Sequence, residues 1–231
     1  MEIRICRWLN RVLLLWLLVA LLFHAVQLVA FNMEYFSWHY RTYDIMADTG
    51  MAYPELMEST REMLSYLLGD REDLVMEVVV GGELQEVFGE REKAHMVDVR
   101  QLVLQGRGFR DLGTALFLFY SGLLFWKRRE CFLLLLASVK RVFAGGILAM
   151  AVVGGLLAWN FERWFVLFHE VFFDNDLWLL DPATDVLINM VPEVFFFNTS
   201  MLILLAFLLE AVLLGAGAAV WSKRTETRQG R

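Results

Sequence analysis

The chain alternates long apolar stretches with polar segments, and this alternation predicts its organisation. Apolar stretches cover residues 12–31, 112–126, 142–159 and 194–221. A helix of about 20 apolar residues spans the roughly 30 Å hydrocarbon core of a bilayer. We therefore predict a mainly α membrane protein, a four-helix transmembrane bundle with an extracytoplasmic α+β cap formed by a hairpin and short interfacial helices.

The same pattern divides the chain into five consecutive segments. Residues 1–32 form a cytoplasmic N-terminus and the first span, which we expect to be retained because AFNME offers no small-x-small cleavage site. Residues 33–111 form a first extracytoplasmic segment, and 112–159 hold the second span, a basic cytoplasmic loop and the third span. A second extracytoplasmic, interfacial segment covers 160–193, and 194–231 hold the last span and a basic tail.

Charge predicts the orientation. The N-terminus, the 127–141 loop and the tail carry three, five and four basic residues, whereas residues 160–193 carry one basic and seven acidic residues. Lys and Arg are enriched in cytoplasmic loops, so both termini are expected in the cytoplasm. Composition agrees with membrane insertion, because 58% of the residues are hydrophobic.

Local patterns predict elements within these segments. Helical spacing of apolar residues predicts a helix that Gly69 closes, and Val75–Val80 followed by Gly81-Gly82 predicts a hairpin. VDVRQLVLQG is a candidate short helix with Asp98 as its N-cap. Residues 131–139 are too few to cross and are expected to lie along the cytoplasmic interface.

The second outer segment is expected to contain an apolar helix that does not cross the membrane. Asp181-Pro182 supplies a start signal and Pro192 a stop. Such a helix, rimmed with Asp, suits the outer leaflet against acyl chains. The alternative is that the segment merely covers the bundle.

The cysteines and two intramembrane residues carry separate expectations. Cys6 and Cys131 lie beside basic clusters on the predicted cytoplasmic side, where thiols stay reduced, so no disulfide is expected. His24 and Glu210 lie at matching depth in the first and last spans, and we predict that they pair. Separate partners for each are the alternative.

His95 and His169 are the candidate catalytic residues. Both fall in outer segments, and His169 lies in an aromatic surrounding where burial and carboxylates would tune its pKa near neutrality. Asp98 either orients His95 or only caps a helix. His39 is expected to be a satisfied polar residue. A metal site built from His95, His169 and nearby Asp is conceivable, but neither histidine belongs to a spaced ligand motif.

Other chemistries lack their motifs in this sequence. It has no Gly-rich phosphate loop, no HExxH and no basic nucleic-acid face, so nucleic acid is not an expected partner. The predicted outer segments contain no cysteine for a thioester, and their serines have no nucleophile-elbow context.

Two motifs carry a family resemblance. EREKAHMVDVR and FHEVFFDNDLWLLDPATDVLINMVPEVFF resemble a family of small integral membrane proteins that includes the lipoprotein intramolecular transacylases. The resemblance extends over most of the chain, and the second motif is long and specific.

The resemblance implies an O-to-N acyl shift within one substrate, a diacylglyceryl lipoprotein with a free α-amine. The sn-2 acyl chain would move to that amine and leave a lyso-form lipoprotein. It implies no cofactor and a bacterial cytoplasmic membrane location. We expect a monomer in contact with membrane lipid, although the sequence itself does not specify an oligomeric state. His95 and His169 would act as base and oxyanion donor, in undecided order. Supporting or substrate-binding candidates are Asp98, Asn175, Trp178, Asp181 and Asp185. The alternative function is a non-enzymatic membrane protein whose outer domain binds a lipid or a protein partner.

Overall fold

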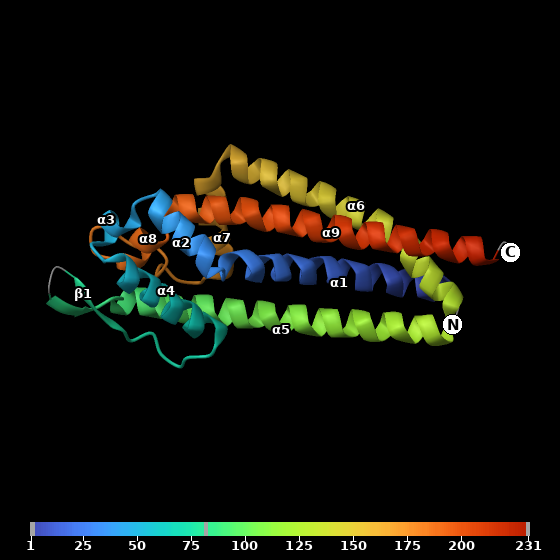
Figure 1. Cartoon of the computed structure of the whole chain (residues 1–231), viewed down its shortest axis with the longest axis horizontal. Helices are drawn as coiled ribbons and strands as arrows, with labels where there is room; N and C mark the ends of the chain where they lie inside the picture. The colour runs from blue at the N-terminus through green and yellow to red at the C-terminus, as the bar shows by residue number, and fades with distance from the viewer. Residues whose placement is uncertain (1–2, 81–82, 230–231) are drawn as a thin grey trace. The chain divides into compact units, whose positions relative to one another are not determined.

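The computed structural model describes residues 3–80 and 83–229, and helices dominate it (Figure 1). The elements follow the order α1 (Ile3–Ala30), α2 (Met33–Thr42), α3 (Ile45–Thr49), α4 (Tyr53–Leu68), β1 (Glu77–Val80), β2 (Glu83–Glu86), α5 (Glu90–Lys127), α6 (Arg129–Trp159), α7 (Phe161–Phe172), α8 (Val186–Met190) and α9 (Glu193–Gln229).

The chain divides into two compact units, which we describe separately. The first unit comprises Met1–Val26, Arg107–Gly155 and Leu202–Arg231, and therefore most of the length of α1, α6 and α9. The second unit comprises Gln27–Gly106 and Leu156–Met201, and it contains the short helices and the hairpin.

Three helices of the described chain are long and apolar enough to cross a membrane: α1, α6 and the Glu193–Ser222 part of α9. The protein is therefore a helical membrane protein. The predicted second span lies in the second half of α5, where Arg110 and Asp111 on one side and Lys127 on the other restrict the apolar run. This part of α5 is not among the described helices that are long and apolar enough to cross a membrane, so the fourth crossing stays a prediction.

Two sequence predictions about helix boundaries are wrong. Residues 131–139 form the first turns of α6 rather than a separate interfacial segment, because the helix continues through Lys140 and Arg141. Asp98 is no N-cap, because α5 already begins at Glu90 and Asp98 lies inside it.

The first unit contains the predicted pair of intramembrane residues. His24 Nδ1 lies 2.7 Å from Glu210 Oε1, which ties α1 to α9. The prediction of this pair is confirmed. An unpaired ionisable group would be costly in hydrocarbon, and this contact satisfies His24 Nδ1 and Glu210 Oε1. Glu210 Oε2 is buried without a partner among the described residues.

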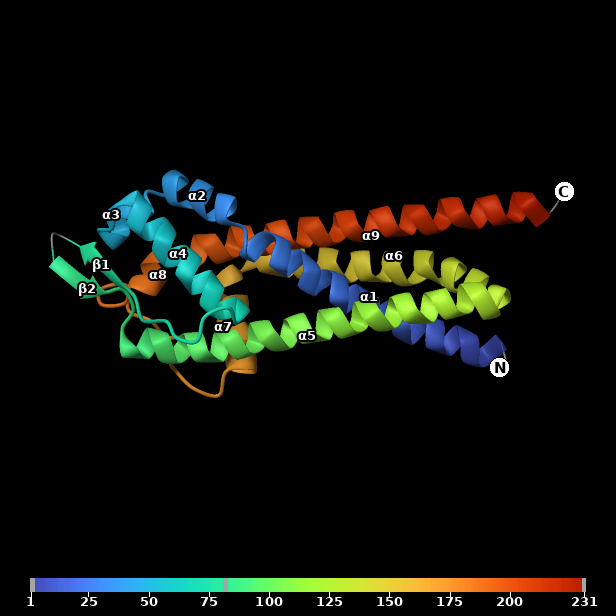
Figure 2. The same cartoon turned by 60° about the horizontal axis from the view of Figure 1, so that its bottom comes forward.

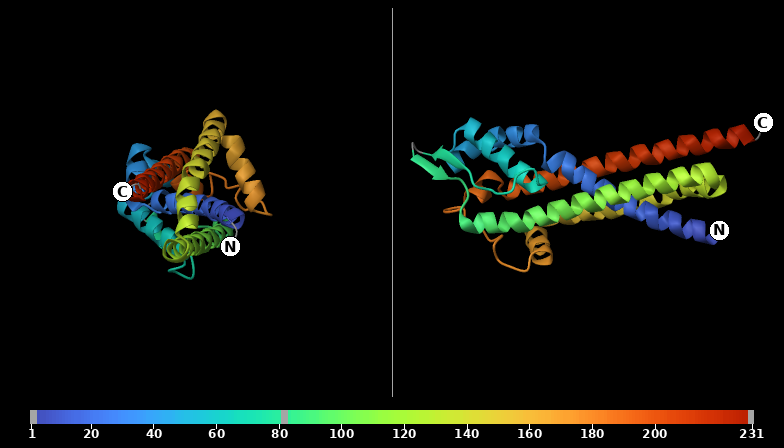
Figure 3. Two further views of the ribbon diagram at one scale, coloured as in Figure 1. Left: turned by 90° about the vertical axis from the view of Figure 1, so that its right-hand side faces the viewer. Right: turned by 90° about the horizontal axis from the view of Figure 1, so that it is seen from below.

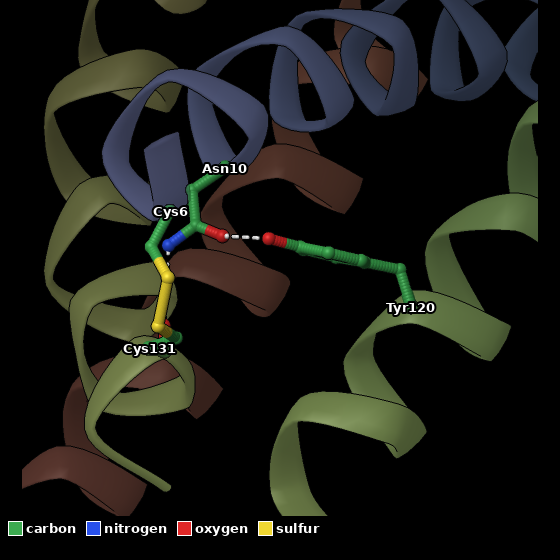
Figure 4. The surroundings of a disulfide bond; sticks show 4 residues. All are labelled: Cys6, Asn10, Tyr120 and Cys131. Carbon is green, nitrogen blue, oxygen red and sulfur yellow. Dashed lines mark hydrogen bonds between the residues drawn. A yellow bond between two sulfur atoms is a disulfide. The ribbon is translucent and has the colours of Figure 1, made fainter. Parts of the chain in front are cut away.

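The expectation of no disulfide is wrong, because Cys6 and Cys131 are joined (Figure 4). The first turns of α1 and α6 bring their Cα atoms to 5.8 Å across a sequence separation of 125. Next to the disulfide, the Asn10 side chain donates to the Cys131 carbonyl and accepts from the Tyr120 hydroxyl. Both cysteines are buried. The spacing of the two residues in sequence gave no sign of this contact.

The second unit has its own hydrophobic core, which confirms several local predictions. α4 ends where Gly69 adopts a positive φ of 85°, and β1 pairs antiparallel with β2 with Val79 opposite Leu84 (Figure 2). The predicted Gly81-Gly82 turn lies outside the described residues. Side chains from α2, α4, α5, α8 and α9 fill the core, among them Phe36, Leu56, Met96, Met190 and Phe195.

Candidate active site: a buried histidine pair

The first histidine of the site is held near the start of α5. Glu92 lies in the first turn of this helix, and its Oε2 accepts the Gly89 backbone N–H at 2.6 Å, which is half of a capping box. His95 follows one turn later and is only 7% exposed. Its Nδ1 is buried without a hydrogen-bond partner among the residues that the structure describes.

The second histidine lies in the last turn of α7. The Asn160 side chain caps this helix by accepting the Arg163 N–H at 3.0 Å. His169 is also 7% exposed, and its Nδ1 lies 2.7 Å from the Phe165 carbonyl oxygen. A carbonyl only accepts, so Nδ1 carries the hydrogen. In the neutral ring the lone pair is therefore on Nε2.

The two histidines lie close together within the second unit, where α7 lies beside the first half of α5 (Figures 2 and 3). Their ring centroids are 6.1 Å apart, and Phe173 lies 5.2 Å from the ring of His95 and 5.5 Å from that of His169. Trp178 stacks on His169 at 4.8 Å. The predicted convergence of His95 and His169 is confirmed.

Burial keeps both imidazoles neutral at neutral pH. Desolvation lowers the pKa of His95 to about 4; the nearby His169 adds to this effect, whereas Asp98 opposes it. Desolvation also lowers the pKa of His169, and the hydrogen bond to Phe165 opposes that shift. A neutral imidazole can accept a proton or donate a hydrogen bond, so the pair fits acid–base chemistry.

The Asp98 side chain binds the loop after α7 and does not orient His95. Asn175 donates to Asp98 Oδ2 at 2.9 Å, and the Trp178 indole N–H donates to the Asn175 carbonyl at 3.0 Å. No hydrogen bond joins Asp98 to His95 in the described part of the chain. The hydrogen bonds from Asp98 to Asn175 and from Asn175 to Trp178 therefore hold the indole ring against His169.

Asp181 and Asp185 lie outside this cluster and shape the turn before α8. Asp181 accepts the Ala183 N–H, and Asp185 accepts the Asp181 N–H at 2.7 Å. The prediction that Asp181 caps the helix is wrong, because α8 begins at Val186 and Asp185 occupies the N-cap position. The three residues between them form turns that the Asp-Pro signal did not reveal. α8 ends at Met190, two residues before Pro192, as predicted.

Sequence reasoning missed Glu92, which connects two parts of the site. Glu92 is 1% exposed, and its Oε1 accepts the buried Leu187 N–H at 2.6 Å. Burial raises the pKa of its carboxyl group, and hydrogen bonds from the backbone oppose the shift. Its position three residues after Gly89 was the available signal, since a Glu there completes half of a capping box.

His39 also departs from expectation, because it is buried but not satisfied. Its side chain is fully buried. The centroid of its ring lies 4.7 Å from that of Tyr43 and 5.0 Å from that of Phe195. Neither ring nitrogen has a partner within residues 3–80 and 83–229. Desolvation lowers its pKa to about 4.

The described residues contain no group of three or more His, Cys, Asp or Glu side chains placed to hold a metal ion. The histidine pair therefore lacks a third protein ligand of these types within that part of the chain.

A helical membrane protein with a buried, neutral histidine pair in a compact unit is the class that these observations define. The family model described as "Lipoprotein intramolecular transacylase Lit" matches residues 11–196, and the chain belongs to this family. Membership implies a membrane acyltransferase of lipoprotein processing.

The solved structures of similar fold come from the same family. The membrane-integral lipoprotein intramolecular transacylase Lit from Bacillus cereus is 21% identical, with a TM-score of 0.75 over 96% of this chain and 98% of that chain. Two variants of it, with one histidine replaced by arginine or alanine, have the same identity and TM-score and are covered to 94% and 96%. The comparison with curated protein sequences found no match.

Proposed function

We propose that this protein is an intramolecular acyltransferase that moves the sn-2 acyl chain of a diacylglyceryl lipoprotein to the α-amine of its N-terminal cysteine. The observation that carries the proposal is the convergence of His95 and His169, two neutral imidazoles with ring centroids 6.1 Å apart. Amine and ester belong to one substrate. Positioning them therefore contributes a large part of the rate, up to about 7–11 kcal/mol in favourable cases.

His169 is the base in this proposal. Its Nδ1–H donates to the Phe165 carbonyl, so the lone pair of Nε2 is available to the substrate. The α-ammonium gives a proton to Nε2, and the amine attacks the sn-2 ester carbonyl. The tetrahedral intermediate then expels the sn-2 oxygen, which takes the proton back from His169, and its nitrogen releases the second ammonium proton to water as the amide forms. One N–C bond forms, one C–O ester bond breaks, one proton is released, and no other reactant is consumed.

His95 supplies the hydrogen bond that stabilises the developing oxyanion. It has no hydrogen-bond partner in the described chain, so its ring remains available to the substrate. Its pKa of about 4 keeps it from competing for the proton that His169 must accept. A donor preorganised in a dry site is typically the largest electrostatic contribution to acyl transfer.

The loop after α7 is the candidate binding surface for the polar head of the substrate. Asn175 is bound to α5 through Asp98, and Trp178 is bound to Asn175 and stacks on His169. Asp181 and Asp185 hold the following turn. Both histidines come from one chain, so the protein is proposed to act as a monomer in contact with membrane lipid, without a cofactor.

The proposed topology has four crossings, both termini in the cytoplasm of a bacterial cell and the histidine pair on the outer face. It rests on the distribution of basic residues and on the apolar second half of α5. In a background with Cys6→Ser and Cys131→Ser, Ala183→Cys should react with a membrane-impermeant thiol reagent in intact cells, and Arg128→Cys should react only after lysis. Labelling of Arg128→Cys in intact cells contradicts the topology.

Acyl transfer itself is tested with the purified protein and a diacylated lipopeptide, with the acyl position read by mass spectrometry. His169→Gln and His95→Gln should each lower the rate by about 10²–10⁴-fold, the usual contribution of a positioned acid or base. His24→Gln is the matched control, because His24 lies in the first unit, and its rate should stay within a few-fold of the wild type.

The same measurement separates the enzyme from a non-enzymatic lipid- or protein-binding membrane protein. A binding protein would leave the lipopeptide unchanged whichever histidine is present. Full activity of His169→Gln, with His95→Gln inactive, would contradict the assignment of the base.

A further inference from the structure

The first unit contains a groove that the acyl-transfer site does not include. It measures ≈ 610 Å³ and lies between α1 and α6, with Phe207 of α9 against it. The volume falls within the range of about 300–1,000 Å³ that small-molecule sites occupy.

Glycine makes room for the groove on α6. A side chain at Gly146 would collide with Leu18 at 2.8 Å, so Gly146 allows α1 and α6 to approach. A Cβ at Gly145 would meet nothing within 4 Å, although Gly145 also lines the groove. The helices are therefore close at one position and leave open space at the next.

The length of the groove matches one leaflet. Along α1 its lining extends from Arg11 to Leu22, about 17 Å at the helical rise. Half of a hydrocarbon core is about 15 Å. An acyl chain lying along the groove would therefore reach from the membrane surface to the bilayer centre.

The chemistry changes along this length. Arg11, Ser138 and Arg141 line the end of the groove that is formed by the earlier residues of α1 and α6. Apolar side chains and glycines line the rest. Neither guanidinium forms an ion pair with another described residue. Guanidinium groups bind phosphate through two parallel hydrogen bonds. Two of them above an apolar groove complement an anionic head with an acyl tail.

We propose that this groove binds one anionic phospholipid of the surrounding leaflet. Arg11 and Arg141 hold its phosphate, and one acyl chain lies over Gly145 against Phe207. This bound lipid is not a substrate, and the proposal does not depend on the acyl-transfer reaction.

The test uses the full-length protein in detergent, titrated with phosphatidylglycerol and read by native mass spectrometry. One molecule per chain should remain bound, and diacylglycerol with the same acyl chains should bind at least about tenfold more weakly, because it lacks the phosphate. The Arg11→Gln, Arg141→Gln double variant should lose a similar factor. Arg7→Gln, Lys140→Gln is its matched control, with two charges removed from the same helices outside the groove lining.

Gly145→Phe tests the apolar part, because the new ring enters open space. It should reduce binding as strongly as the double arginine variant, whereas Gly217→Phe, also unobstructed but outside the groove, should not. Equal binding of diacylglycerol, equal loss in the control pair or unchanged binding in the double arginine variant would each overturn the proposal. Should Gly145→Phe elute as an aggregate, the arginine variants decide alone.

Discussion

The two units hold their histidines differently. In the first, His24 of α1 contacts Glu210 of α9. The buried atoms Trp16 Nε1, Ser121 Oγ and Glu210 Oε2 of that unit lack hydrogen-bond partners among the described residues. In the second, two buried histidines, His39 and His95, lack hydrogen-bond partners in the described chain. The contact of His24 with Glu210 lowers the cost of inserting ionisable groups into lipid. In the second unit, the unpartnered ring of His95 is available for chemistry, whereas that of His39 only costs stability.

Replacement of Glu92 should destabilise the second unit most, because both of its buried carboxylate oxygens accept backbone hydrogen bonds. Glu92→Ala leaves the buried Leu187 N–H without its acceptor and opens a cavity. We expect a loss of about 1–3 kcal/mol for the unsatisfied N–H, with a further loss for the cavity. Thermal unfolding in detergent measures it.

Glu92→Gln is the control, because an amide oxygen keeps one acceptor at almost the same volume. It should retain most of the stability that Glu92→Ala loses. Equal stability of Glu92→Ala and the wild type would show that the contact with α8 does not hold the second unit together.

The contrast between the units explains what the sequence could predict. Hydrophobic periodicity and turn residues are local signals, and they predicted α4 with Gly69 and the hairpin. The boundaries of the long helices were harder to predict. The polar residues Arg110 and Asp111 lie inside α5 and do not end the helix. Asp98 was therefore mistaken for a helix start.

Contacts between distant residues were predictable only where chemistry required a partner. His24 and Glu210 could be paired because an ionisable group in a span needs one. Cys6 and Cys131 could not, because a buried cysteine is equally stable as a small apolar residue. The contact of Glu92 with Leu187 depends on the loop that returns α8 to α5, and no periodicity encodes that path.

His39 tests the cost of an unpartnered histidine through pH. Desolvation lowers its pKa from the ordinary histidine value of 6.5 to about 4 in the folded protein, so the unfolded state binds a proton first as pH falls. The stability contribution is complete above about pH 6.5 and is lost as pH falls toward 4. At pH 5 the loss is about 2 kcal/mol.

His39→Phe removes this titration and suits the aromatic surroundings of Tyr43 and Phe195. The difference in melting temperature between the variant and the wild type should grow in favour of the variant from pH 7 to pH 5. A difference that stays constant over this range would mean that His39 titrates equally in both states.

The smallest effect on stability is expected for the pair of His24 and Glu210 in the first unit. Hydrogen bonds between membrane helices contribute about 0.6 kcal/mol on average and up to about 1.7 kcal/mol, because the unfolded state within the membrane also finds partners. A double-mutant cycle with His24→Ala, Glu210→Ala and the double variant should therefore give a coupling energy of about 1 kcal/mol in unfolding measurements. Strict additivity would mean that each side chain is satisfied separately despite their 2.7 Å contact. Acyl transfer should remain within a few-fold of the wild type in all three variants, since the pair belongs to the unit that does not contain His95 and His169.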